Sequence, residues 1–330
     1  MVALGKGRSR AAVLGVVALA CTVGLSACGG SGGSGGSGDS GGSGESGTTA
    51  MKVGVTPVGD FAPIYYAKEK GIFAKNGLDV TIDPKGASEV PPLISGSYQA
   101  VSMAWATFIQ ASAQGVPLRA IFPGINGAAD TQTGIYVMPS SGISSVKDLE
   151  GKNVAINQPK ANFELNSRVA LQEAGVDVDK VQFQVLPLAT MADALVAGKV
   201  DAAYLVPPFS VQAEDKKAKL LLDPYAGRLA GSPIAGYVMS EAFVKQNPKA
   251  VAAFKASMAE AAEQLNTSKS YRDFVTTYTK LTPELAAKVP AYEFPTAIDV
   301  EKLQAVADLM AETGFATKKV DISQLLVDDK

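Results

Sequence analysis

Residues 51–82 read MKVGVTPVGDFAPIYYAKEKGIFAKNGLDVTI, and this stretch indicates a strand, a helix and a second strand in succession. Met51–Pro57 has valines at alternate positions, which predicts a strand. Ala62–Lys75 predicts a helix, and Leu78–Ile82 predicts the next strand. Strand–helix alternation of this kind predicts α/β units around a mostly parallel sheet.

The chain also contains a weak internal repeat. LISGSYQA at 93–100 aligns with LVAGKVDA at 195–202, and each stretch reads as a helix end, a glycine stop and a buried strand. GIYVM at 134–138 and GYVM at 236–239 form a second pair at nearly the same offset. Any α/β protein can produce one such match by chance, but two correlated pairs favour two similar lobes. The paired Gly-Tyr-Val-Met strands are then predicted to cross between the lobes.

Three stretches together resemble a known family. GVTPVGDFAPIYYAKEKGIFAKNGLDVTI at 54–82 resembles the opening of the nitrate/sulfonate/taurine and thiamine-pyrimidine group of periplasmic solute-binding proteins. SSVKDLEGKNVAI at 144–156 and ALVAGKVDAAYLVPPF at 194–209 resemble the second-lobe signatures of that group. The resemblance implies an α/β, bilobed type II periplasmic-binding-protein fold, with two lobes joined by two crossing strands.

The same resemblance implies the domain organisation and the partners. Lobe one is expected at 50–134 plus 237–330, and lobe two at 135–236. The partners implied are a small-molecule solute and an ABC permease with its ATPase. The solute implied is a sulfonate, taurine or nitrate-type anion, or a pyrimidine-like heterocycle. The chain is expected to act as a monomer that binds by lobe closure, without a cofactor.

The front of the chain indicates export. Basic residues among the first ten precede an apolar run at 11–25, and this pattern predicts a lipoprotein signal peptide at 1–27. LSAC at 25–28 resembles the bacterial lipobox, which implies that Cys28 is lipidated, with acyl chains such as palmitate. The Gly/Ser-rich stretch within 28–49 predicts a flexible tether. The expected location is the extracytoplasmic face of the cell membrane; a plain secretory signal is the alternative.

Composition excludes several classes of function. The chain has no histidine, which removes Ser-His-Asp and Cys-His catalysis and the histidine zinc sites, and no metal site is expected. Without residues 1–28, the chain has 27 Lys and Arg against 32 Asp and Glu, a net charge of −5, which does not indicate nucleic-acid binding. A non-enzymatic binding protein is therefore expected. A ligand-sensing surface lipoprotein and a histidine-independent enzyme are the alternatives.

Candidate ligand-binding residues follow from one rule: open α/β sheets bind ligands beyond the carboxyl ends of their strands. The segments that follow the predicted strands supply most of the candidates, and the second crossing strand supplies Tyr237. The candidates are Asp60, Phe61, Trp105, Thr107, Gln158, Lys160, Asn162, Phe163, Tyr204, Phe209 and Tyr237. Helix starts in these segments favour an anion, whereas the number of rings favours an organic solute.

Each candidate also has a purely structural explanation. Trp105 and the other aromatic residues also fill protein cores. Asp60 can cap a helix, and Gln158 and Asn162 can do the same. Lys160 can be an ordinary solvated lysine.

Overall fold

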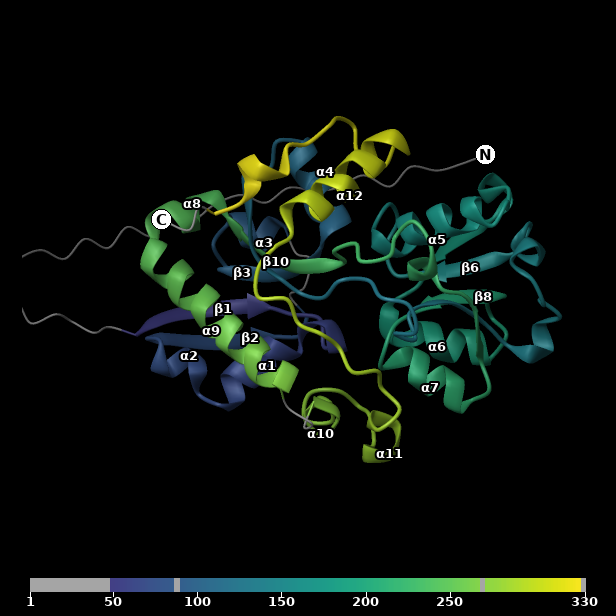
Figure 1. Cartoon of the computed structure of the whole chain (residues 1–330), viewed down its shortest axis with the longest axis horizontal. Helices are drawn as coiled ribbons and strands as arrows, with labels where there is room; N and C mark the ends of the chain where they lie inside the picture. The colour runs from purple at the N-terminus through teal and green to yellow at the C-terminus, as the bar shows by residue number, and fades with distance from the viewer. Residues whose placement is uncertain (1–47, 86–89, 268–270, 328–330) are drawn as a thin grey trace, which may run out of the picture. The chain divides into compact units, whose positions relative to one another are not determined.

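The computed structural model of the chain describes residues 48–85, 90–267 and 271–327 (Figure 1). The predicted signal peptide, Cys28 and nearly all of the predicted tether lie outside these residues. Within the described ranges, none of the helices has both the length and the apolar character needed to cross a membrane.

The first sheet has five strands in the order β2-β1-β3-β10-β4. Its strands are β1 (Thr49–Gly54), β2 (Leu78–Asp83), β3 (Ala100–Ala104), β4 (Leu118–Pro123) and β10 (Ala235–Ser240). β1 pairs in parallel with β2 and β3, so the predicted strand–helix–strand unit is confirmed. β10 comes from late in the chain and pairs antiparallel with β3 and β4.

The second sheet has the corresponding order β7-β6-β8-β5-β9. Its strands are β5 (Gly134–Val137), β6 (Asn153–Ile156), β7 (Gln182–Val185), β8 (Ala202–Leu205) and β9 (Lys219–Leu222). β3 and β8 are the central strands of their sheets, and β10 and β5 each hold the fourth place. Each of β3 and β8 follows a helix and a left-handed glycine, Gly96 and Gly198 respectively. The internal repeat therefore marks equivalent elements of two similar sheets.

The segments that pass between the sheets differ from the prediction. The two Gly-Tyr-Val-Met strands were expected to cross, but β5 and β10 are each buried inside one sheet, bonded to strands on both sides. The crossings are the preceding segments, 124–133 and 223–234. These two segments pair with each other, because Gly127 N donates to Ser232 O at 2.8 Å and Ile234 N donates to Ile125 O at 3.1 Å.

Helices cover the sheets. The α-helices are α1 (Ala62–Glu69), α2 (Ile72–Lys75), α3 (Val90–Ile94), α4 (Trp105–Ala113), α5 (Asn162–Glu173), α6 (Leu188–Val196), α7 (Phe209–Asp215), α8 (Glu241–Gln246), α9 (Pro248–Thr267), α10 (Tyr271–Val275), α11 (Pro283–Ala286) and α12 (Val300–Glu312). In Figure 1, α9 and α12 lie with the first sheet, and α5, α6 and α7 lie with the second. The final segments of the chain thus return to the first sheet.

One local prediction about a helix is wrong. One helix was expected over Ala62–Lys75, but Gly71 adopts φ +69°, a left-handed conformation that ends α1 and starts α2. The glycine stop after α6, at Gly198, is as predicted.

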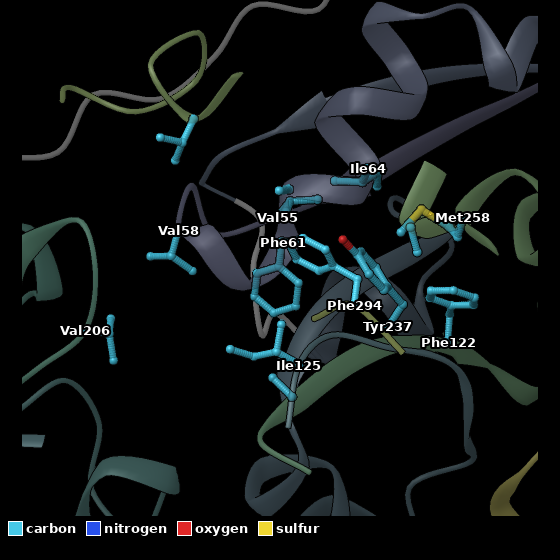
Figure 2. Close-up of a cluster of buried hydrophobic side chains, with 14 of the residues drawn as sticks. Val55, Val58, Phe61, Ile64, Phe122, Ile125, Val206, Tyr237, Met258 and Phe294 are labelled. Carbon is cyan, nitrogen blue, oxygen red and sulfur yellow. The ribbon is translucent and has the colours of Figure 1, made fainter. Parts of the chain in front are cut away.

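The largest hydrophobic cluster draws on both sheets. Figure 2 shows Phe61 close to Ile125 and Tyr237, with Val206 set apart on the side of the second sheet. The limits of the two lobes stay a prediction, although each sheet takes its strands from the expected parts of the chain.

Candidate functional site

A cavity of about 90 Å³ lies at the carboxyl ends of β1, β3, β6 and β8. Residues after these strands form most of its wall, and the crossing segments contribute Thr133, Tyr225 and Ile234. The cavity is therefore lined from both sheets and from both connections between them. It has room for several water molecules or a small solute.

The wall from the second sheet is aromatic. The rings of Phe163 and Tyr204 are stacked, with centroids 4.4 Å apart and planes at 26°. Asn166 Nδ2 donates to Tyr204 Oη at 3.2 Å and to Tyr225 Oη at 2.8 Å, which fixes both phenols. Burial raises the pKa of both tyrosines, so they stay neutral. This wall offers a flat, neutral surface to a ligand.

The wall from the first sheet holds a buried acid. Asp60 lies in the short 3₁₀ helix Gly59–Phe61 and is 9 % exposed. Burial raises the pKa of its carboxyl group from 3.8 to about 6. No side chain in the described part of the protein forms an ion pair or hydrogen bond with this carboxylate. Next to it, the Phe61 ring meets Tyr237 edge-on, with centroids 5.5 Å apart.

Neutral polar groups complete the lining. Ser102 Oγ accepts a hydrogen bond from Thr56 N at 3.1 Å, which leaves the serine hydroxyl hydrogen for another acceptor. Asn157 Oδ1 is buried and has no partner within the described part of the protein. Nowhere among the described residues do three His, Cys, Asp or Glu side chains gather into a group able to hold a metal ion.

The structure brings part of the predicted site together. The predicted residues that line the cavity are Asp60, Phe61, Gln158, Asn162, Phe163 and Tyr204. They reach it because the cavity lies beyond the carboxyl ends of the strands, as the rule for α/β sheets requires. Their contact with a ligand stays a prediction.

Trp105 and Thr107 lie away from the cavity. Trp105 follows β3 directly, but its ring is fully buried and covers the backbone of β10, where a Cβ on Gly236 would lie 2.1 Å from it. The ring also meets Phe108 edge-on, so Trp105 is a core residue. Thr107 lies in the first turn of α4 with its hydroxyl oxygen buried. The cavity is lined instead by Ala104, the residue before α4.

Three further predicted residues also lie elsewhere. Lys160 is exposed and lines a separate surface hollow with Arg168 and Glu312. Phe209 is the first residue of α7, and its partly buried ring packs against the core. Tyr237 is buried beneath Phe61 and does not line the cavity.

Sequence reasoning missed some lining residues. Tyr225 and Thr133 lie in the irregular crossing segments, where no strand end points to them. Ser102 lies within β3 itself and not in the segment that follows the strand. Asn157 lies in a segment that the rule selects, and its position directly after β6 was the available signal.

The chain matches one family model, described as NMT1/THI5 like, over residues 58–267. A comparison with curated protein sequences finds no match.

Solved structures share the fold at low sequence identity. The alkanesulfonate-binding protein SsuA from Xanthomonas axonopodis pv. citri, bound to MOPS, has a TM-score of 0.71 and 19 % identity, covering 85 % of this chain and 99 % of that one. The periplasmic nitrate-binding protein NrtA from Synechocystis PCC 6803 has a TM-score of 0.69 and 16 % identity, covering 84 % and 86 %. The desulfurization enzyme DSZB has a TM-score of 0.64 and 13 % identity, covering 85 % and 97 %.

Proposed function

The chain belongs to the NMT1/THI5-like family, and from that premise we propose that it is an extracytoplasmic solute-binding protein that serves an ABC importer. Its fold is the bilobed type II periplasmic-binding-protein fold. The observation that carries the proposal is the cavity between the two sheets, which both sheets and both crossing segments line. Closure of the two lobes about the crossings would bury a solute there, and the importer would recognise the closed form.

The solute is proposed to be small and organic. The family resemblance leaves two classes open, a sulfonate, taurine or nitrate-type anion and a pyrimidine-like heterocycle. The stacked rings of Phe163 and Tyr204 support a solute with a flat apolar part. An inorganic anion gains little from such a surface.

Calorimetry combined with small-angle scattering tests the binding role. The full chain would be titrated with taurine, methanesulfonate, benzenesulfonate, nitrate and 4-aminopyrimidine. We expect at least one of them to bind, to reduce the radius of gyration and to be recovered unaltered. Phe163→Leu should weaken binding about two- to tenfold, since one ring contact is worth about 0.5–1.5 kcal/mol. Phe209→Leu is the matched control, because that ring does not line the cavity. A solute that binds tightly without compaction would contradict closure.

The lipid anchor at Cys28 and the location at the outer face of the membrane are part of the same proposal. The LSAC stretch and the apolar run before it support them. Cys28→Ser should release the protein from the membrane fraction and abolish incorporation of labelled palmitate. Retention of label in this variant would refute the anchor.

Two other roles are compatible with the same fold. A ligand-sensing lipoprotein would use the same cavity without an importer, and purification with or without the permease distinguishes the two. A histidine-independent enzyme finds support in the desulfurization enzyme that shares the fold. The cavity lining, however, includes neither histidine nor cysteine. Chemical change in a bound probe after incubation would favour the enzyme.

A further inference from the structure

The cavity has an unbalanced set of charges. Asp60 is the one lining residue with a formal charge, because lysine and arginine are missing from the lining. The basic residues of the adjacent segment are directed elsewhere. Lys160 is exposed at a different hollow, and Arg168 Nε donates to Glu164 Oε1 at 2.8 Å. The chain contains no histidine that could supply a positive charge.

Two unsatisfied groups of the cavity are acceptors, one on each wall. The Asp60 carboxylate is more than nine-tenths buried; its backbone N–H is its one hydrogen-bond donor among the described residues, and no basic side chain there pairs with it. Asn157 Oδ1, on the opposite wall, is buried without a donor among the same residues. Buried acceptors cost free energy until a donor reaches them. A ligand that carries N–H donors satisfies both walls.

One feature of the lining favours an anion, the start of α5 at Asn162. A helix start presents free N–H groups and a partial positive charge. Glu164 lies in the first turn of α5, but it forms an ion pair with Arg168 and accepts a hydrogen bond from Lys160 N, which precedes the helix. The helix start therefore keeps its partial positive charge, which is smaller than the full negative charge of Asp60.

We propose that this cavity binds an organic cation, with its ammonium or amidinium group at Asp60 and its flat apolar group against Phe163 and Tyr204. The proposal rests on the solute-binding role and specifies its ligand class. The carboxylate supplies a charge-assisted hydrogen bond in a buried position, and the electron-rich ring faces attract a cation as well. An alkanesulfonate or nitrate ion would instead meet a buried negative charge without a basic partner.

The acid also gives the proposal a pH signature. Six titratable groups interact electrostatically with Asp60. They are the phenols of Tyr204, Tyr225, Tyr237, Tyr271, Tyr278 and Tyr292. Burial raises the pKa of all six, so none titrates near pH 6. Because the pKa of Asp60 is about 6, about nine-tenths of the carboxyl groups are protonated at pH 5. Cation affinity should therefore fall about tenfold between pH 8 and pH 5, and anion affinity should rise.

Three probes of one shape but different charge test the proposal. The full chain would be titrated by calorimetry with benzylammonium, benzyl alcohol and benzenesulfonate, whose charges are constant between pH 5 and pH 8. We expect benzylammonium to bind most tightly at pH 8 and to release about half a proton per molecule bound at pH 6. Asp60→Asn should weaken its binding 10- to 100-fold and leave benzyl alcohol unchanged. The control Asp79→Asn removes an equal charge from an exposed position. It should change the binding of neither benzylammonium nor benzyl alcohol.

Several results would overturn the cation assignment. One is tighter binding of benzenesulfonate than of benzylammonium to the wild-type protein; another is proton uptake on binding. Failure of benzylammonium to bind at 10 mM also overturns it. If benzenesulfonate binds and is recovered unaltered, the solute-binding role stands while the cation assignment fails. If benzylammonium binds and is chemically changed, the charge assignment stands while the binding-protein role fails.

Discussion

Replacing Asp60 by asparagine is expected to stabilise the solute-free protein at neutral and alkaline pH. Burial raises the pKa of this carboxyl group from 3.8 to about 6. The folded state therefore binds the Asp60 proton more tightly than the unfolded state does. One pKa unit corresponds to about 1.4 kcal/mol. The ionised side chain thus lowers the free energy of unfolding by about 3 kcal/mol at pH 8.

The sign of the pH dependence follows directly. Below pH 3.8 the carboxyl group is protonated in both states, and it imposes no charge penalty on the fold. As the pH rises from 3.8 to 6, the unfolded state loses its proton first, so stability falls. Above pH 6 both states are ionised and the full penalty of about 3 kcal/mol is present. Asparagine has the same shape without the charge and should not show this change.

Urea unfolding of the two proteins from pH 4 to pH 8 measures the effect. Both would first be refolded from urea to remove any bound solute. We expect Asp60→Asn to be more stable by about 3 kcal/mol at pH 8 and by close to zero at pH 4. The control Asp79→Asn changes an exposed carboxylate and should not reproduce the gain of about 3 kcal/mol at pH 8. If the wild-type protein is as stable as Asp60→Asn at pH 8, or more stable, the argument that Asp60 is buried without a basic partner is refuted.

Three further substitutions test the crossings, the cavity wall and an ion pair between α7 and the segment after α11. Gly127→Ala places a Cβ 2.1 Å from the Tyr225 ring, so we expect a loss of about 1–3 kcal/mol in urea unfolding; an unchanged midpoint would contradict this close packing. Tyr225→Phe leaves Asn166 Nδ2 without one of its two acceptors, and a loss of about 1 kcal/mol is expected by the same measurement. Lys288→Gln removes a half-exposed ion pair to Asp215, 3.2 Å long, and should change stability by less than about 1 kcal/mol. A larger loss would show that this pair is protected from solvent.

Much of the fold could be predicted from the sequence because it depends on local patterns. The alternating valines before Pro57 predict β1, and the glycine stops at Gly96 and Gly198 predict the entries into β3 and β8. The error over the crossing strands has a physical cause. A buried strand in the centre of a sheet and a strand that crosses between lobes have the same apolar sequence, so β5 and β10 could not be distinguished from crossings. Their place depends on pairing partners far away in the chain.

The site was predictable by segment and less so by side chain. The carboxyl-end rule selects the segments around Asp60, Phe163 and Tyr204, which do line the cavity. It does not give the direction of each side chain. Trp105 begins its helix at the right edge of the sheet, but its ring turns toward Gly236, where the missing side chain leaves room for it. That choice depends on a residue 131 positions later in the chain, which no local pattern around Trp105 contains.

The burial of Asp60 connects the stability of the protein with its selectivity. A carboxylate that is removed from water without a partner destabilises the fold, and a neutral residue of the same shape would avoid that cost. The arrangement is favourable only when a donor from outside the chain completes it, and the unpaired oxygen of Asn157 on the opposite wall has the same need. A cation that satisfies Asp60 lowers the pKa of its carboxyl group and recovers the lost stability as binding free energy. An anion would add to the penalty unless Asp60 first took up a proton. The same desolvation that weakens the empty protein at pH 8 thus sets the charge of the ligand it accepts.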